Sequence, residues 1–208
     1  MIYDPKLSKA GSTQVNKLKM KVENEDGIPT KKIELVITSP LTRAIDTCLG
    51  SFFPNDTTEK RLFGDKPLVC PLTREKLHKS GDIGISCSSL KEKYGNNRLD
   101  FSVLEQHQHP EQWWYDEEEL PNGGPLALVQ ESAHKTKKRC KMFLEWLSKR
   151  EETYIVVVCH SYFIKHLTNM SRKLNNCEIK KYDLSIQPTN TNVTKEVVSM
   201  EGTKSDAQ

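Results

Sequence analysis

Short apolar runs separated by stretches with helical spacing make up the hydrophobic pattern of this chain. Residues 33–38 (IELVIT), 67–70 (PLVC) and 154–158 (YIVVV) are compact, largely apolar runs, which is the pattern of buried strands. After the first run, apolar residues at offsets of three and four predict a helix over 41–52 with one buried face. After the last run, the same spacing predicts a helix over 161–170.

The rest of the pattern adds a long helix, a further strand and a polar end. Apolar residues at helical spacing predict a helix over 126–147, and two basic residues follow it, as the negative end of a helix dipole favours. Apolar positions over 179–186 predict a strand. Residues 187–208 are rich in Thr, Asn, Ser and Lys, and we expect them to form a loose tail. One domain over 1–186 is therefore expected, followed by that tail.

The alternation of strands and helices predicts the fold class. It favours an α/β fold, a three-layer αβα sandwich with a mostly parallel sheet. Such sheets bind ligands at the carboxyl ends of their strands. Ser39 and Pro40 follow the first predicted strand, where a serine N-cap and a proline at the first helical position are both favoured. We therefore expect the first helix to begin there.

Three side chains suited to binding an anion lie at the predicted strand ends. Arg43 is in the first turn of the first helix, His160 directly follows the strongest strand, and Glu75 lies just beyond the strand at 67–70. A helix N-terminus offers free backbone N–H groups and a favourable dipole, and a guanidinium matches the geometry of phosphate or carboxylate. The residues therefore predict an anion pocket at which an arginine, a histidine and a glutamate converge.

Each candidate also has an ordinary structural interpretation. Arg43 fits a solvated helix surface, His160 a buried structural role, and Glu75 a surface position. Cys159 is either a thiol activated at a helix N-terminus or a plain core residue. The aromatic run 113–115 fits either a lid over the substrate or a packed loop. The remaining histidines have no clustered carboxylate or cysteine partners, so we predict no metal site.

Composition and charge narrow the class of protein. The chain has 208 residues, of which 36% are hydrophobic and 28% charged, with a mean hydropathy of −0.64, which favours a folded core over a disordered chain. No apolar run approaches the ~20 residues of a membrane-spanning helix. The net charge of +3 gives no argument for nucleic acid, so we predict neither a nucleic-acid nor a membrane partner.

The cysteines and one basic stretch bear on location. Six cysteines without a C-x-x-C pair favour reduced thiols, and no signal-peptide pattern opens the chain. A cytoplasmic protein is therefore expected. The basic stretch 135–141 fits either a solvated helix face or a nuclear address, so a nuclear location also stays open.

The sequence resembles the histidine phosphatase superfamily, also called the phosphoglycerate mutase-like family. The match runs in order over about residues 4–186, and accessory segments resemble the plant and fungal branch. The main stretches are Asp4-Pro5-Lys6-Leu7-Ser8-Lys9-Ala10-Gly11 with Gln14 and Leu18, Ile37-Thr38-Ser39-Pro40-Leu41-Thr42-Arg43-Ala44 with Thr47, Arg74-Glu75, and Val156-Val157-Val158-Cys159-His160-Ser161. The branch-specific segments are Asp100-Phe101-Ser102, Trp113-Trp114 and Asn176-Cys177-Glu178.

The resemblance implies a reaction and a set of roles. The family hydrolyses phosphomonoesters through a phosphohistidine, without a metal or other cofactor. By motif match, Arg43 and His160 would contact the phosphoryl group and Glu75 would donate the proton, while Ser39 and Ser161 would help to bind the substrate. The expected partner is a phosphorylated small molecule or a phosphoprotein.

The chain departs from the family at its nucleophile. The family's Arg-His-Gly or Arg-His-Ala motif, whose histidine is phosphorylated, does not occur in this sequence. Its strand lies in the middle of the family's sheet, so we expect the sheet to lack that first strand and to carry unpaired edges. Either the chain is an incomplete version of a longer protein or it is an isoform that has lost catalysis. Little or no turnover is expected, and the alternative is a non-catalytic pseudophosphatase that binds phosphate or phosphoproteins.

Overall fold

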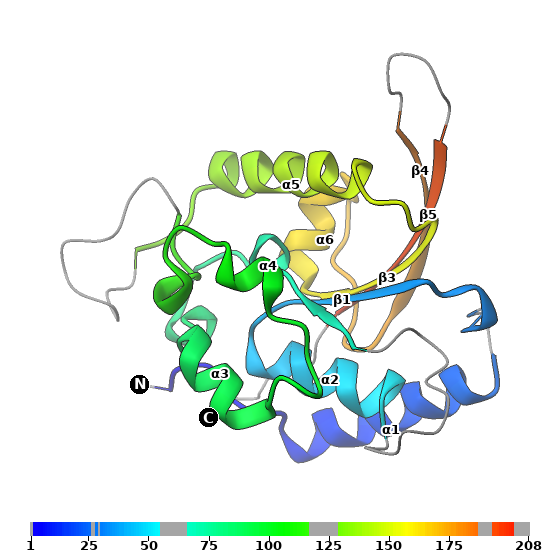
Figure 1. The fold of residues 1–208 in the computed structure, drawn as a ribbon, viewed down its shortest axis with the longest axis horizontal. Helices are drawn as coiled ribbons and strands as arrows, with labels where there is room; N and C mark the ends of the chain where they lie inside the picture. Colours follow the sequence, from blue (N-terminus) through cyan, green and yellow to red (C-terminus); the bar gives the residue numbers. More distant parts are fainter. Residues whose placement is uncertain are drawn as a thin grey trace.

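A five-stranded sheet forms the centre of the molecule. The computed structural model describes residues 2–25, 28, 30–54, 66–116, 129–186 and 193–201. Its strands are β1 (Leu35–Thr38), β2 (Leu68–Val69), β3 (Tyr154–Cys159), β4 (Ile179–Ile186) and β5 (Val193–Glu201). They lie in the order β2-β1-β3-β5-β4, and every neighbouring pair is parallel except β4 with β5 (Figure 1).

Helices cover both faces of this sheet. In Figure 1 two of them, α1 and α2, lie on one face, and α5 and α6 lie on the other. The helices are α1 (Lys9–Glu23), α2 (Thr42–Phe52), α3 (Cys87–Tyr94), α4 (Ser102–Glu105), α5 (Ala133–Ser148) and α6 (Ser161–Leu167). Short 3-10 turns are formed by Thr30–Lys32, Pro71–Thr73, Ser80–Asp82 and Pro110–Gln112.

The side chains of β3 divide between two apolar cores. Alternate residues of a strand point to opposite faces of a sheet. Val156 and Val158 join the core that includes α1 and α2, whereas Ile155 and Val157 join the core built with α5 and α6. All six residues of β3 are buried. The predicted three-layer αβα sandwich with a mostly parallel sheet is thereby confirmed.

The predicted strands over 33–38, 67–70, 154–158 and 179–186 are confirmed as β1, β2, β3 and β4. A fifth strand, β5, was not expected from the sequence. Val193–Glu201 form β5 within the segment that was predicted to be a loose tail. Because β5 pairs with β3 on the side away from β1, β3 is hydrogen-bonded along both edges. The expectation of unpaired edges in the middle of the sheet is therefore wrong for β3.

The helix predicted to begin at Ser39 and Pro40 is α2, and it begins later, at Thr42. Its N-terminus is capped by a residue from another part of the chain. Leu41 is the N-cap residue of α2 and makes no side-chain cap, while the Ser39 hydroxyl accepts a hydrogen bond from Leu41 N at 3.3 Å. The Asp4 carboxylate instead accepts from Thr42 N at 2.8 Å and from the Thr42 hydroxyl at 2.7 Å. Asp4 has a positive φ of 36°, a backbone region that Asp tolerates better than most residues.

The long predicted helix is shorter at its start. α5 begins at Ala133, where the Ser132 hydroxyl caps it by accepting from Lys135 N at 3.2 Å. Val129 precedes the helix and is exposed, and residues 117–128 lie outside the described part of the chain. The aromatic run Trp113–Tyr115 is buried, which favours the packed loop of the two interpretations.

The buried Asp4 carboxyl gives the stability of the fold a pH dependence. Burial raises the pKa of Asp4, although the hydrogen bonds from Thr42 and the charge of Arg43 act in the opposite direction. Because the folded-state pKa lies above the unfolded one, this group's contribution is lost as pH rises through the folded-state pKa. We expect wild type to lose stability relative to Asp4→Asn as pH increases from about 3.5 to 7. Urea unfolding of both chains measures this difference; Asp183→Asn, which removes an exposed carboxylate, is the control, and a difference independent of pH would contradict the prediction.

A glycine close to a buried indole supplies a packing test. A Cβ added to Gly84 would lie 2.1 Å from an atom of the Trp113 ring, which is fully buried and donates its Nε1–H to Ile85 O at 2.8 Å. Gly84→Ala is therefore expected to lower the free energy of unfolding by about 1–3 kcal/mol. In Gly81→Ala, the control, the nearest heavy atom to the new Cβ belongs to Pro5 at 3.5 Å, an ordinary contact. Equal urea midpoints for the two variants would contradict the prediction, because the Trp113 indole would then have moved aside without lowering the free energy of unfolding.

Candidate functional site

The carboxyl ends of three strands meet at one edge of the sheet. In the sheet register Thr38 at the end of β1 is paired with Val69 of β2 and with Val158 of β3. The ladder continues one step further, because Ser39 N donates to Val158 O at 3.0 Å and Cys70 N donates to Thr38 O at 2.9 Å. The segments that follow these strands therefore leave the sheet side by side, as a parallel sheet requires.

His160 and Ser39 are in direct contact at this edge. His160 Nε2 lies 2.8 Å from the Ser39 hydroxyl oxygen, within hydrogen-bond distance, and both residues are buried, with exposed fractions of 1% and 0%. The next hydroxyl, that of Ser161 in the first turn of α6, is also buried, and it makes no hydrogen bond to any residue that the structure describes. A buried hydroxyl without a partner is costly, so this position favours a ligand that offers a hydrogen-bonding group.

Arg43 is held in a buried ion pair. Its guanidinium donates to Asp82 Oδ1 at 2.9 Å and to Gly81 O at 2.8 Å, and its exposed fraction is only 4%. The interpretation of Arg43 as a solvated helix residue is therefore wrong. Two of the five guanidinium N–H groups serve these contacts. Asp82 was not foreseen from the sequence, because nothing in the pattern around residues 80–82 distinguishes it from a surface turn.

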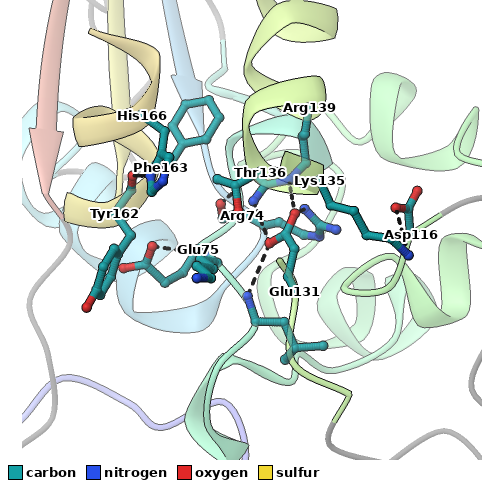
Figure 2. Close-up of polar contacts among 12 residues, drawn as sticks. Arg74, Glu75, Asp116, Glu131, Lys135, Thr136, Arg139, Tyr162, Phe163 and His166 are labelled. Atoms are coloured by element: carbon teal, nitrogen blue, oxygen red, sulfur yellow. Dashed lines mark hydrogen bonds and ion pairs between the residues drawn. The ribbon is translucent and has the colours of Figure 1, made fainter. Parts of the chain in front are cut away.

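Glu75 lies in the loop after β2, and it too is buried, with an exposed fraction of 4%. One carboxylate oxygen, Oε1, accepts a hydrogen bond from Lys76 N at 2.9 Å. The interpretation of Glu75 as a surface residue is therefore wrong. Figure 2 shows its carboxylate directed toward the side of Tyr162 in α6, the helix that follows His160.

A cluster of charged residues next to Glu75 was not predicted. Glu131 lies between Arg74 and Arg139, and all three side chains are buried (Figure 2). Burial raises the pKa of Glu131, while Arg74 and the amide of Leu77 act to lower it. The sequence signal for Arg139 was its place on the apolar stripe of α5, between Thr136 and Phe143. The basic stretch is thus not one solvated helix face, because Arg139 points into the protein while its neighbour Lys138 is exposed.

The buried cysteines are poor candidates for thiol chemistry. Burial raises the pKa of Cys70 and of Cys140 to about 12. Cys159 is completely buried at the end of β3 and lies in the α5–α6 core, which supports its interpretation as a core residue.

Other kinds of site are not evident at this edge of the sheet. Among the described residues no group of His, Cys, Asp and Glu side chains is arranged to hold a metal ion. A cavity of about 540 Å³ is lined by residues around the start of β1, including Glu34, Asp100 and Glu105, and by none of the candidate residues. None of the helices in the described part of the chain has the length and apolar character needed to cross a membrane.

Comparison with known proteins points to one family. A model of the histidine phosphatase superfamily (branch 1) matches residues 89–205, more than half of the chain, and this region includes His160. Phosphoglycerate mutase-like protein 1 of Arabidopsis thaliana is 28% identical over 204 residues, which cover 86% of this chain and 65% of that protein. A second phosphoglycerate mutase-like protein of Arabidopsis thaliana is 26% identical over 217 residues, covering 94% of this chain and 73% of that protein.

The chain thus spans about two thirds of the length of these curated relatives. No solved structure matches it significantly. The family match agrees with the mostly parallel sheet and with a buried histidine where β3 ends. On this sequence evidence, the chain belongs to the histidine phosphatase superfamily.

Proposed function

We propose that the site handles the phosphoryl group of a phosphomonoester, in a reaction that passes through a phosphohistidine. The observation that carries this proposal is the buried contact of His160 with Ser39 at the carboxyl ends of β3 and β1, beside the unsatisfied hydroxyl of Ser161. A phosphoryl oxygen would give Ser161 the hydrogen-bond partner that it lacks. Membership of the histidine phosphatase superfamily supports the same chemistry.

Each candidate residue would have its own role in such a reaction. The nucleophilic histidine forms a P–N bond as the P–O bond to the leaving group breaks, and water then hydrolyses the phosphohistidine. Arg43 and His160 would stabilise the charge on the phosphoryl oxygens. Glu75 would protonate the leaving alkoxide and later take a proton from the attacking water. Ser39 would orient His160, and Ser161 would bind a phosphoryl oxygen.

The sequence contains the residues proposed for binding and proton transfer but no Arg-His-Gly or Arg-His-Ala motif. We therefore propose that this 208-residue chain turns over phosphomonoesters slowly or not at all. The purified chain is expected to hydrolyse p-nitrophenyl phosphate at the background rate in the presence of EDTA. Metal-independent turnover that disappears in His160→Ala would overturn this expectation, because one of the chain's own residues would then be the nucleophile.

The phosphoryl-transfer proposal itself is tested by the 5′ end of the native transcript. If the reading frame continues upstream into an Arg-His-Gly or Arg-His-Ala segment, the longer chain is expected to form a phosphohistidine that is stable to alkali and labile to acid. His160→Ala should slow its hydrolysis of the substrate by ~10²-fold or more. A longer chain that carries the motif and forms no phosphohistidine would refute the proposal.

The second candidate function is binding of phosphate or phosphoproteins without turnover. The buried contact of His160 with Ser39 and the unsatisfied hydroxyl of Ser161 favour it, because these groups can bind a phosphoryl group without a nucleophile. We expect inorganic phosphate to bind the 208-residue chain in calorimetric titrations, and Ser161→Ala, which removes only the unsatisfied hydroxyl, to weaken binding without destabilising the fold.

Arg43 needs a paired design, since Arg43→Ala leaves Asp82 buried without its partner at a cost of ~3–5 kcal/mol in stability. The double variant Arg43→Ala/Asp82→Asn is expected to recover much of that stability and still to lose phosphate binding. If the double variant binds phosphate with wild-type affinity, Arg43 does not contribute to phosphate binding. Urea unfolding and calorimetry on the same preparations separate the two effects.

A further inference from the structure

The loop that carries Glu75 has no regular secondary structure between the 3-10 turns at Pro71–Thr73 and Ser80–Asp82, yet its backbone is anchored on both sides of Glu75. On one side, Arg139 Nη1 donates to Leu72 O and to Arg74 O, both at 2.8 Å. On the other side, Glu131 N donates to Leu77 O at 2.8 Å, and Leu77 N donates to Glu131 Oε2 at 3.3 Å.

One carboxylate joins these anchors. Glu131 Oε1 accepts from Arg139 Nε at 3.1 Å and from Arg74 Nη1 at 3.4 Å. Oε2 accepts from Arg139 Nη2 at 2.9 Å, in addition to the Leu77 amide. Each oxygen therefore faces two donors, and the single negative charge lies between two positive ones (Figure 2). Charge-assisted bonds of this kind are stronger and more geometrically specific than neutral ones.

Arg139 also connects the loop to the helix that follows His160. Its guanidinium lies over the ring of Phe163, with the central carbon 5.4 Å from the ring centroid. Phe163 is fully buried in α6, and Ser161, the first residue of α6, directly follows His160. A single guanidinium thus contacts both the segment that carries Glu75 and the helix that begins at His160.

We propose that Glu131 and Arg139 are positioning residues, which hold the Glu75 carboxylate at a fixed place relative to His160. The inference rests on the proposed function, which gives Glu75 the role of the acid. Neither residue would touch the substrate in this role. Proton transfer requires the acid within hydrogen-bond reach of its target, and an untethered irregular loop would not maintain such a position.

The test uses the hydrogen bond from Lys76 N to Glu75 Oε1 as a local reporter. The ¹H chemical shift of the Lys76 amide should change with pH as Glu75 ionises in the wild-type 208-residue chain. The part of this pH dependence that is absent in Glu75→Gln is the part that comes from Glu75. In Glu131→Gln the new amide nitrogen would face two donors where an oxygen accepted both. We expect this variant to lose the pH-dependent Lys76 shift and to exchange the Lys76 and Leu77 amides at least ~10-fold faster.

Two further variants separate positioning from general destabilisation. Leu18→Ala destabilises the fold from α1, which packs against α2, and should leave the Lys76 shift and its pH dependence unchanged. Arg139→Lys replaces the planar guanidinium with a single ammonium group, which cannot maintain the four hydrogen bonds that Arg139 donates to Glu131, Leu72 and Arg74. This variant is the replacement test if Glu131→Gln does not fold. A wild-type Lys76 signature in both Glu131→Gln and Arg139→Lys, or in whichever of them folds, would overturn the proposal, as would its loss in Leu18→Ala.

These measurements do not depend on phosphate or on turnover, so the two proposals fail separately. A longer chain that carries the motif and forms no phosphohistidine, but shows the expected Lys76 response, would refute the proposed function and retain the positioning roles of Glu131 and Arg139. A chain that forms a phosphohistidine when extended, yet keeps its Lys76 response in both variants, would refute the positioning roles alone.

Discussion

The parallel pairing of β1 with β3 determines where Ser39 and His160 meet. Thr38 lies opposite Val158, and the ladder continues through Ser39 N to Val158 O. This register brings the Ser39 hydroxyl to His160, although the two residues are 121 positions apart in the sequence. A slip of one residue would turn every side chain of β3 to the opposite face and separate this pair. Such a slip would also repack both apolar cores, because β3 contributes side chains to each of them.

Arg43, Arg74 and Arg139 are all buried, and each is paired with a carboxylate. Asp82 pairs with Arg43, and Glu131 serves both Arg74 and Arg139. Bringing charges out of water costs several kcal/mol for each ion, and only good geometry with further hydrogen bonds recovers that cost. The carbonyl acceptors of the loops complete the geometry for Arg43 and Arg139. Specific contacts between helix arginines and the connecting segments thus build these polar parts of the interior.

The sequence was informative where the structure depends on local pattern. Continuous apolar runs located β1 and β3, and the strand-end rule led from them to His160, which is indeed buried there beside Ser39. The contacts that the sequence did not reveal join distant residues: Asp4 caps α2 from 38 positions away, and Glu131 bonds to Arg74 across 57. β5 was missed for another reason, since its polar and β-branched residues have the composition of a loose tail.

The two outer strands of the sheet differ in how they limit self-association. An exposed strand edge is a template for pairing with another chain, and charged side chains or a short length reduce that hazard. β4 carries Lys181 and Asp183 as exposed residues. β2 has only two residues, and Asp100 already bonds to the backbone beside it, accepting from Val69 N and donating to Pro67 O. β2 therefore offers little free edge, and the charged side chains of β4 act against the pairing of its longer edge with a second molecule when the protein is concentrated.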